Sequence, residues 1–180
     1  MITDSGNDSD GRFVYALLSV NYAKLLLACI YAPNVFNDDF LPSISSTLLR
    51  YQSPYCVVAG DFNATVSPDL DRSLGTQDTV PPSSLALRSF LADLNLVDPW
   101  RIRNVNVKAY SSYSCRHGTS SRIDYIFSSP SLINHTPHIS MLPILISDHA
   151  PVLCTITPFI DHPKIHRWRL MTPYLAMQTF

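Results

Sequence analysis

The chain has 180 residues, 46% of them hydrophobic, and a formal net charge of −1 at pH 7. This length suits one domain that buries roughly 70% of its unfolded surface. The longest apolar stretches fall well short of the roughly 20 residues that span a bilayer, and the first residues lack the features of a signal peptide. We therefore expect no membrane contact and an intracellular location, nuclear or cytoplasmic. All 14 acidic residues are Asp, and the chain contains no Glu.

The first sixty residues predict two strands joined as a hairpin, one helix and a third, short strand. A proline interrupts the helical spacing of the apolar positions, so the helix is expected to begin only after it. The expected elements are strands over 11–20, 24–31 and 55–59 and a helix over 43–51.

The remaining chain predicts a long loop over 63–82, then a helix, then several strands. Ser83 or Ser84 can cap the helix, whose apolar face follows the i, i+3, i+4, i+7 pattern from Leu87 to Leu94. Strands that alternate with helices early and crowd together late predict an α/β sandwich. The late strands are expected near 113 and over 122–128, 140–146 and 151–157.

The positions of the predicted strands and helices also indicate the domain organisation. We predict a disordered N-terminus over 1–10, one domain over 11–158, and a tail or linker over 159–180. His162 and His166 have i, i+4 spacing, but Pro163 lies between them and no third ligand stands nearby, so we interpret them as tail residues.

The cysteines are widely scattered, and none forms a CxxC pair. We interpret them as buried free thiols, with disulfides or a zinc site as the alternative. They are Cys29, Cys56, Cys115 and Cys154.

Between Asp98 and Asp124 the chain has no acidic residue and several basic ones, with aromatic residues among them. Such a stretch can track phosphates and stack on bases. A solvated basic loop is the alternative. The basic residues are Arg101, Arg103, Lys108, Arg116 and Arg122.

Three polar clusters each adjoin an apolar run. A carboxylate at the edge of a hydrophobic strand costs free energy unless it is paired, so three such sites suggest convergence on a cation, a histidine or a phosphate. The clusters are Gly60-Asp61-Phe62-Asn63, Ser121-Arg122-Ile123-Asp124-Tyr125 and Ser147-Asp148-His149.

Each cluster also has an ordinary structural interpretation. Asp61 and Asn63 lie on the same side of an extended segment and could orient a water and hold a phosphate oxygen, or simply end a strand. Ser147 and His149 share a face while Asp148 faces away, which argues against a local nucleophilic triad. A neighbouring Asp-His pair is often only a structural hydrogen bond.

Asp124 follows Arg122 and Ile123 in a predicted strand, where an inward carboxylate needs a partner. An imidazole N–H could supply it, and the pair would fix the tautomer of His149 and favour its charged form. The alternative is a surface ion pair between Asp124 and Arg122, because residues i and i+2 share a face.

In this order the clusters resemble the endonuclease/exonuclease/phosphatase superfamily, of the DNase I and exonuclease III type. The resemblance runs from about Gly11 to Leu170 and looks in particular like the endonuclease of LINE-type non-LTR retrotransposon polyproteins. Trp168-Arg169-Leu170 is similar to the segment that leads toward the reverse transcriptase, which is then an expected partner domain. The matching motifs are Ile30-Tyr31-Ala32-Pro33-Asn34, the three polar clusters, Leu96-Val97-Asp98-Pro99-Trp100-Arg101, Tyr110-Ser111-Ser112-Tyr113-Ser114 and Arg116-His117.

The resemblance implies a DNase I-like fold of two stacked sheets flanked by helices, and Mg²⁺-dependent cleavage of phosphodiesters in DNA. It implies that Asp61 orients or deprotonates the attacking water and that Asn63 hydrogen-bonds the reacting phosphate. Asp124 would orient His149, His149 would stabilise charge developing on the phosphate, and Asp148 would lie beside the metal.

The resemblance also implies residues that bind phosphate or DNA. Tyr31 and Asn34 would contact phosphate. Ser111 matches a position where retrotransposon relatives carry Thr, so its hydroxyl function is expected to survive. Arg116 and Arg122 would bind DNA from the basic stretch.

One departure from the family pattern is the absence of its early Asn and its metal-binding Glu. We therefore expect an N-terminally truncated domain that lacks the first strands and helix, binds Mg²⁺ more weakly and is impaired as an enzyme. The alternatives are a non-catalytic remnant that binds nucleic acid or a protein, and a phosphatase of the same fold that acts on a small phosphate ester.

Overall fold

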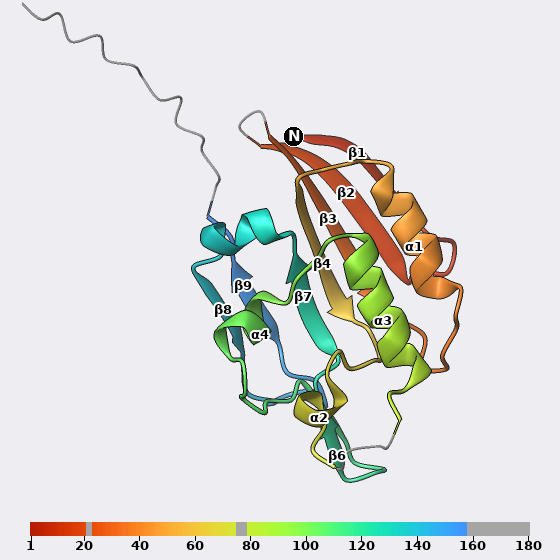
Figure 1. The fold of residues 1–180 in the computed structure, drawn as a ribbon, viewed down its shortest axis with the longest axis vertical. Helices are drawn as coiled ribbons and strands as arrows, with labels where there is room; N and C mark the ends of the chain where they lie inside the picture. The colour runs from red at the N-terminus through yellow and green to blue at the C-terminus, as the bar shows by residue number, and fades with distance from the viewer. Residues whose placement is uncertain (21–22, 75–78, 158–180) are drawn as a thin grey trace, which may run out of the picture.

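The computed structural model describes residues 1–20, 23–74 and 79–157. Its centre is a five-stranded sheet in the order β1-β2-β3-β4-β7 (Figure 1). The parallel pair is β3 with β4, and the other neighbours are antiparallel. The strands are β1 (Ile2–Asn7), β2 (Phe13–Val20), β3 (Ala23–Tyr31), β4 (Tyr55–Asp61) and β7 (Asp124–Ser128).

Two helices, α1 (Phe40–Leu49) and α3 (Pro82–Asp93), cover one face of this sheet (Figure 1). The main hydrophobic core lies beneath them and contains Phe90 and Phe127, which are almost completely buried. Helix α1 begins before Pro42, not after it as predicted, because a proline in the first turn removes only an N–H that has no intrahelical partner there.

Helix α3 begins at Pro82, just before the predicted serine caps, and is capped differently. Its N-cap is Pro81, and no side chain caps it. Ser84 is buried instead, and its Oγ lies 3.3 Å from Oγ1 of Thr65, so the predicted serine cap is wrong. The other helical elements of the described residues are two short helices, α2 (Pro68–Asp71) and α4 (Pro99–Arg103), and a 3-10 helix (Pro130–His135).

Two short hairpins lie beside the main sheet: β5 (Ser112–Ser114) with β6 (Thr119–Ser121), and β8 (His138–Met141) with β9 (Val152–Thr155). The strand predicted over 140–146 is mostly wrong, because the chain leaves the ladder at Met141 and residues 142–146 are exposed. Pro143 cannot donate to a ladder, which explains this early end.

The face of the main sheet opposite the helices is also apolar. A smaller core there joins Leu25, Val57 and Leu132, with Ile156 packed against it from just beyond β9. The pair β8–β9 is thus the second layer of the expected α/β sandwich within the described residues. This arrangement confirms a mixed α/β fold with helices on one side and further strands on the other.

The structure tests the prediction for the N-terminal end of the chain but not the one for the C-terminal end. The prediction of a disordered N-terminus over 1–10 is wrong, because β1 pairs with β2 from Ile2 to Asn7. The predicted tail over 159–180, with its two histidines, lies outside the described residues, as does the turn of the β2–β3 hairpin.

All four cysteines are free, as predicted, but only Cys56 is buried. No helix in the described part of the chain is long and apolar enough to cross a membrane.

Candidate active site

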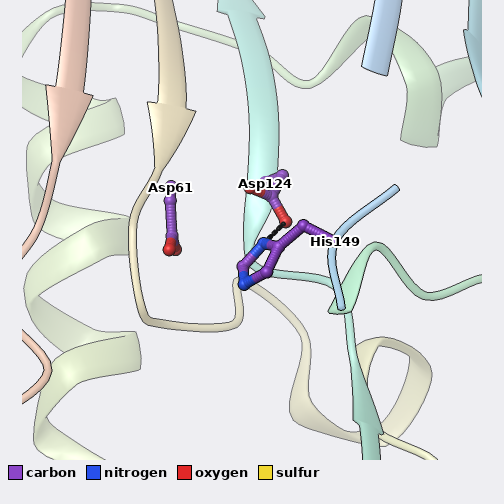
Figure 2. Close-up of side chains that lie close together, drawn as sticks. All are labelled: Asp61, Asp124 and His149. Atoms are coloured by element: carbon purple, nitrogen blue, oxygen red, sulfur yellow. Dashed lines mark hydrogen bonds and ion pairs between the residues drawn. The ribbon is translucent and has the colours of Figure 1, made fainter. Parts of the chain in front are cut away.

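The strand ends place two carboxylates side by side. Asp61 is the last residue of β4 and Asp124 is the first residue of β7, and the antiparallel register pairs them directly. Tyr31, the last residue of β3, is the register partner of Asp61 on its other side. Figure 2 shows the carboxylates of Asp61 and Asp124 at the same edge of the sheet, with the ring of His149 beside them.

Gly60 makes this strand end sterically feasible. Its φ is +140°, and a Cβ there would lie 1.9 Å from the carbonyl oxygen of Ile30 on the neighbouring strand. Only glycine fits both constraints, so it allows β4 to stay paired with β3 up to Asp61.

The predicted pairing of Asp124 with His149 is confirmed. Nδ1 of His149 lies 2.9 Å from Oδ2 of Asp124 (Figure 2). Nε2, on the opposite side of the ring, lies 3.3 Å from Oγ of Ser112. A ring fixed through Nδ1 can present Nε2 to a ligand. Arg122 plays no part in this pair, so the alternative Asp124–Arg122 ion pair is wrong.

Charge and burial shift two pKa values in the site. Partial burial lowers the pKa of His149, but the hydrogen bond that its ring donates to Asp124 and the negative charges of Asp124, Asp61 and Asp148 outweigh this and raise it overall. Desolvation raises the pKa of Asp61, and the charge of Asp124 raises it further, against the backbone N–H of Asn63 and the charge of His149. The site therefore favours a protonated imidazole beside a carboxylate with a raised pKa.

Asn63 connects the predicted phosphate-contact residues. Its backbone N–H donates to Oδ1 of Asp61 at 2.8 Å, and its side-chain Nδ2 donates to the carbonyl of Ala32 and to Oδ1 of Asn34. Both amide hydrogens are thus engaged, so Asn63 can donate to a phosphate only by releasing one of them. Tyr31 is 51% exposed at the same edge.

Ser111 differs from its predicted role. It is completely buried, and its Oγ accepts the backbone N–H groups of Ile123 and Asp124 at 3.0 and 2.9 Å. Its carbonyl accepts the N–H of Ala150, next to His149. A direct phosphate contact by Ser111 is therefore wrong, since its hydroxyl fixes the backbone that carries Asp124.

The ligand atoms of Asp61, Asp124 and His149 all lie within 4.8 Å of one another. Among the described residues these three could hold a cation, whereas the predicted metal residue, Asp148, is exposed and bonds to Ser147 outside this group. Oxygen ligands suit Mg²⁺, which commonly uses one or two carboxylates and keeps several waters. The carboxylates of Asp61 and Asp124 therefore suit a divalent cation.

The predicted basic surface over 101–122 is wrong for Arg101 and Arg122, whose charges are paired within the protein. Arg122 is 2% exposed, with its Nε 2.8 Å from Oδ1 of Asp71 and its Nη1 2.6 Å from Oδ2 of Asp98. Arg101 binds Asp71 at 2.6 Å, and Arg103 donates to the carbonyl of Thr136. The charges of Arg101 and Arg122 are thus paired inside the protein, whereas Arg103 bonds only to backbone carbonyls.

Arg103, Lys108 and Arg116 are exposed in that stretch. A DNA contact by Arg122 is contradicted by its burial. A contact by Arg116 stays a prediction.

Sequence reasoning missed this buried network. Arg122 lies 4.9 and 4.5 Å from the ring centroids of Trp100 and Tyr125, and Asp71 also accepts the N–H of Ser67. Asp98 gave a usable signal, because an Asp before Pro99 is a typical helix N-cap and its Oδ1 does accept the N–H of Arg101. No sequence signal marks Asp71 as buried, because it lies in a polar stretch that is typical of a surface loop.

The family model described as the endonuclease/exonuclease/phosphatase family matches residues 39–149, which span α1 to His149. The chain belongs to this family. The transposon TX1 uncharacterized 149 kDa protein of Xenopus laevis is 26% identical over 175 residues, which cover 94% of this chain and 13% of that protein. The relationship to a transposon-encoded protein is thus supported, and the chain spans a small part of that relative.

Solved structures share the fold. A 3' phosphatase, NExo, from Neisseria bound to a product DNA hairpin superposes with a TM-score of 0.67 at 17% identity, over 87% of this chain and 71% of that chain. The AP endonuclease LMAP from Leishmania major gives 0.67 at 22% identity, over 84% and 56%. The catalytic domain of APE2 from Xenopus laevis gives 0.63 at 20%, over 82% and 57%. The DNase I-like fold class predicted from the sequence is therefore confirmed.

Proposed function

We propose that this chain is a Mg²⁺-dependent phosphodiesterase that nicks DNA, of the retrotransposon endonuclease type. The observation that carries the proposal is the Asp124–His149 pair at 2.9 Å, placed at the same strand ends as Asp61. A charge-fixed imidazole next to a separate carboxylate is suited to hydrolysis at phosphorus, where catalysis depends on positioning and electrostatic stabilisation.

Each residue has a distinct part in the proposed reaction. Asp61 accepts a proton from the attacking water, and its raised pKa brings it closer to the working pH of a general base. His149, whose pKa Asp124 raises, donates from Nε2 to a phosphate oxygen in place of the Ser112 hydroxyl that lies 3.3 Å away. A bound divalent cation would neutralise negative charge on the phosphate and lower the barrier.

We further propose that the rate is low. The 180 residues contain no Glu, so the Asp carboxylates of the site must serve several tasks. Oδ2 of Asp124 is occupied by His149 and Oδ1 of Asp61 by the N–H of Asn63, which leaves few oxygens for a cation. Losing one preorganised electrostatic contact typically costs about 10²- to 10³-fold in rate.

A substrate comparison tests the proposal against its alternatives. Supercoiled plasmid and an oligonucleotide with a 3' phosphate are incubated in parallel with Mg²⁺ or with EDTA. We expect slow formation of nicked circles with Mg²⁺, none with EDTA, and little phosphate release. Phosphate release without nicking would favour a phosphatase. DNA binding without either reaction would favour a non-catalytic remnant.

A further inference from the structure

The segment that carries Ser112 is tied directly to the loop that carries His149. Ser112 and His149 are partners in an antiparallel bridge, and the N–H of Tyr113 donates to the carbonyl of Asp148 at 2.9 Å. A second bond, of 2.6 Å, joins the residue before Ser112 to the residue after His149. The backbone therefore holds Ser112 opposite His149 from both sides.

The hydroxyl of Ser112 faces the free nitrogen of the His149 ring. Its Oγ lies 3.3 Å from Nε2, while Nδ1 on the other side of the ring is held by Asp124. Figure 2 shows the second ring nitrogen turned away from Asp124. Residues directly opposite each other in an antiparallel pair project to the same face, so this contact follows from the backbone pairing. The Ser112 hydroxyl thus lies where a ligand of His149 must bind.

Ser112 keeps a hydrogen-bond donor that the protein does not use. A serine hydroxyl offers one O–H and two acceptor lone pairs. Within residues 1–20, 23–74 and 79–157, the hydrogen bonds of its Oγ come down to the contact with Nε2. Because the site favours a protonated imidazole, Nε2 donates and the Ser112 oxygen accepts. The O–H is then left for a ligand.

The order Ser112, His149, Asp124 also resembles a nucleophilic triad, in which the imidazole removes the serine proton. A triad needs a neutral ring nitrogen to accept that proton. A charged ring donates from both nitrogens and accepts at neither. The protonation that the site favours therefore suits Ser112 to donating a hydrogen bond and not to attacking as a nucleophile.

Two other serine hydroxyls near the site are engaged within the protein. The Ser111 hydroxyl is completely buried and accepts two backbone N–H groups. The Ser147 hydroxyl donates to Oδ1 of Asp148 and accepts the N–H of His149. Ser112 is only partly buried, so a ligand that reaches Nε2 also reaches its hydroxyl.

We propose that Ser112 is a substrate-binding residue, whose hydroxyl donates to a non-bridging oxygen of the same phosphodiester that His149 contacts. When the phosphate replaces the contact between Oγ and Nε2, the two donors lie side by side and face one anion. Hydrogen bonds to a charged oxygen are stronger than those between neutral groups. This inference rests on the proposed nuclease function and adds a phosphate contact that the sequence did not predict.

Binding of a small phosphodiester tests this contact without catalysis. The dinucleotide d(TpT) is titrated in EDTA at fixed pH into the 180-residue chain labelled with ¹⁵N at histidine. The ring signals of His149, assigned by their absence from His149→Ala, are followed by NMR. Ser112→Ala should raise the Kd by about 10-fold, because a hydrogen bond to a charged group is lost. Ser112→Thr keeps the hydroxyl and should keep the Kd.

Ser46→Ala is the matched control. Ser46 is exposed on α1, and its hydroxyl bonds to the carbonyl of Pro42, so its removal should leave the Kd unchanged. The Nδ1–H signal of ligand-free His149 should persist in Ser112→Ala, because Asp124 holds that nitrogen. An unchanged Kd in Ser112→Ala, an equal loss in Ser46→Ala, a lost Nδ1–H signal, or no response of His149 to d(TpT) would each overturn the proposal.

Plasmid nicking separates this inference from the proposed function. With Mg²⁺, Ser112→Ala should lower kcat/KM by about 10-fold, and Ser112→Thr should retain it. Nicking that Ser112→Ala leaves unchanged would overturn the Ser112 contact while leaving the nuclease intact. Absence of nicking by the unsubstituted chain would refute the nuclease, and d(TpT) binding would still decide whether Ser112 contacts phosphate.

Discussion

Gly60 sets the geometry of the site at the scale of one residue. A Cβ at this position would lie 1.9 Å from the Ile30 carbonyl, and the φ of +140° disfavours any side chain. Gly60→Ala should therefore destabilise the fold by more than about 1 kcal/mol. Gly118→Ala is the control, since Gly118 has a φ of +59° but open space around it. Urea unfolding should show a larger loss for Gly60→Ala, and equal losses would refute the close-contact argument.

Asp124 is paired with His149 in the structure. Its hydrogen bond and its charge both raise the pKa of His149. Asp124→Asn should therefore lower that pKa, measured by NMR titration of the imidazole in metal-free buffer. Asp93→Asn, an exposed substitution at the end of α3, is the control and should leave it unchanged. An unshifted His149 pKa in Asp124→Asn would contradict the pairing.

At the scale of elements, a buried ion-pair network joins α2, α4 and the segment that enters β7. Asp71 is completely buried and contacts both Arg101 and Arg122. Removing one partner of such a network leaves buried charge uncompensated and typically costs about 3 to 5 kcal/mol. Asp71→Ala should therefore lower the free energy of unfolding by an amount of this size, measured by chemical denaturation. Asp69→Ala, an exposed residue of the same helix, should cost almost nothing, and similar losses would contradict the network's importance.

The strands and helices that local pattern specifies were predictable from sequence. The hairpin of β2 and β3, the helix α3 and the meeting of Asp61, Asp124 and His149 all follow from periodicity and from carboxylates at strand ends. Burial of Arg122 was not predictable, because its partners Asp71 and Asp98 lie 51 and 24 residues away. The predicted phosphate contact of Ser111 was wrong for a related reason. The sequence shows that a hydroxyl is present but not whether it faces a ligand or the backbone.

The predicted disorder over 1–10 hid β1, whose polar residues carry little apolar signal because the strand lies at the edge of the sheet.

At the scale of the whole molecule, buried titratable groups make the free energy of unfolding depend on pH in the alkaline range. Burial raises the pKa of Cys56 to about 12 and holds the pKa of Tyr125 well above its usual value. Groups with raised folded pKa values stabilise the fold below their unfolded pKa values and lose this contribution as pH rises. The free energy of unfolding should thus fall above about pH 9.

Paired cysteine variants test this pH dependence. Cys56→Ala should lessen the fall between pH 8 and pH 10, whereas Cys29→Ala, which removes an exposed thiol, should not. A free energy of unfolding that stays constant over this range in the unsubstituted chain would contradict the argument.

The central claim is that the edge carrying Asp61, Asp124 and His149 hydrolyses phosphodiesters with Mg²⁺. The most direct measurement is the initial rate of plasmid nicking by folded samples of the unsubstituted chain, His149→Ala and His138→Ala, with folding checked by circular dichroism. His138 is an exposed histidine that bonds to Ser140 away from the site. We predict slow Mg²⁺-dependent nicking that His149→Ala lowers by about 10²-fold or more and His138→Ala leaves unchanged. Nicking that persists in His149→Ala, or no nicking by the unsubstituted chain, would contradict the claim.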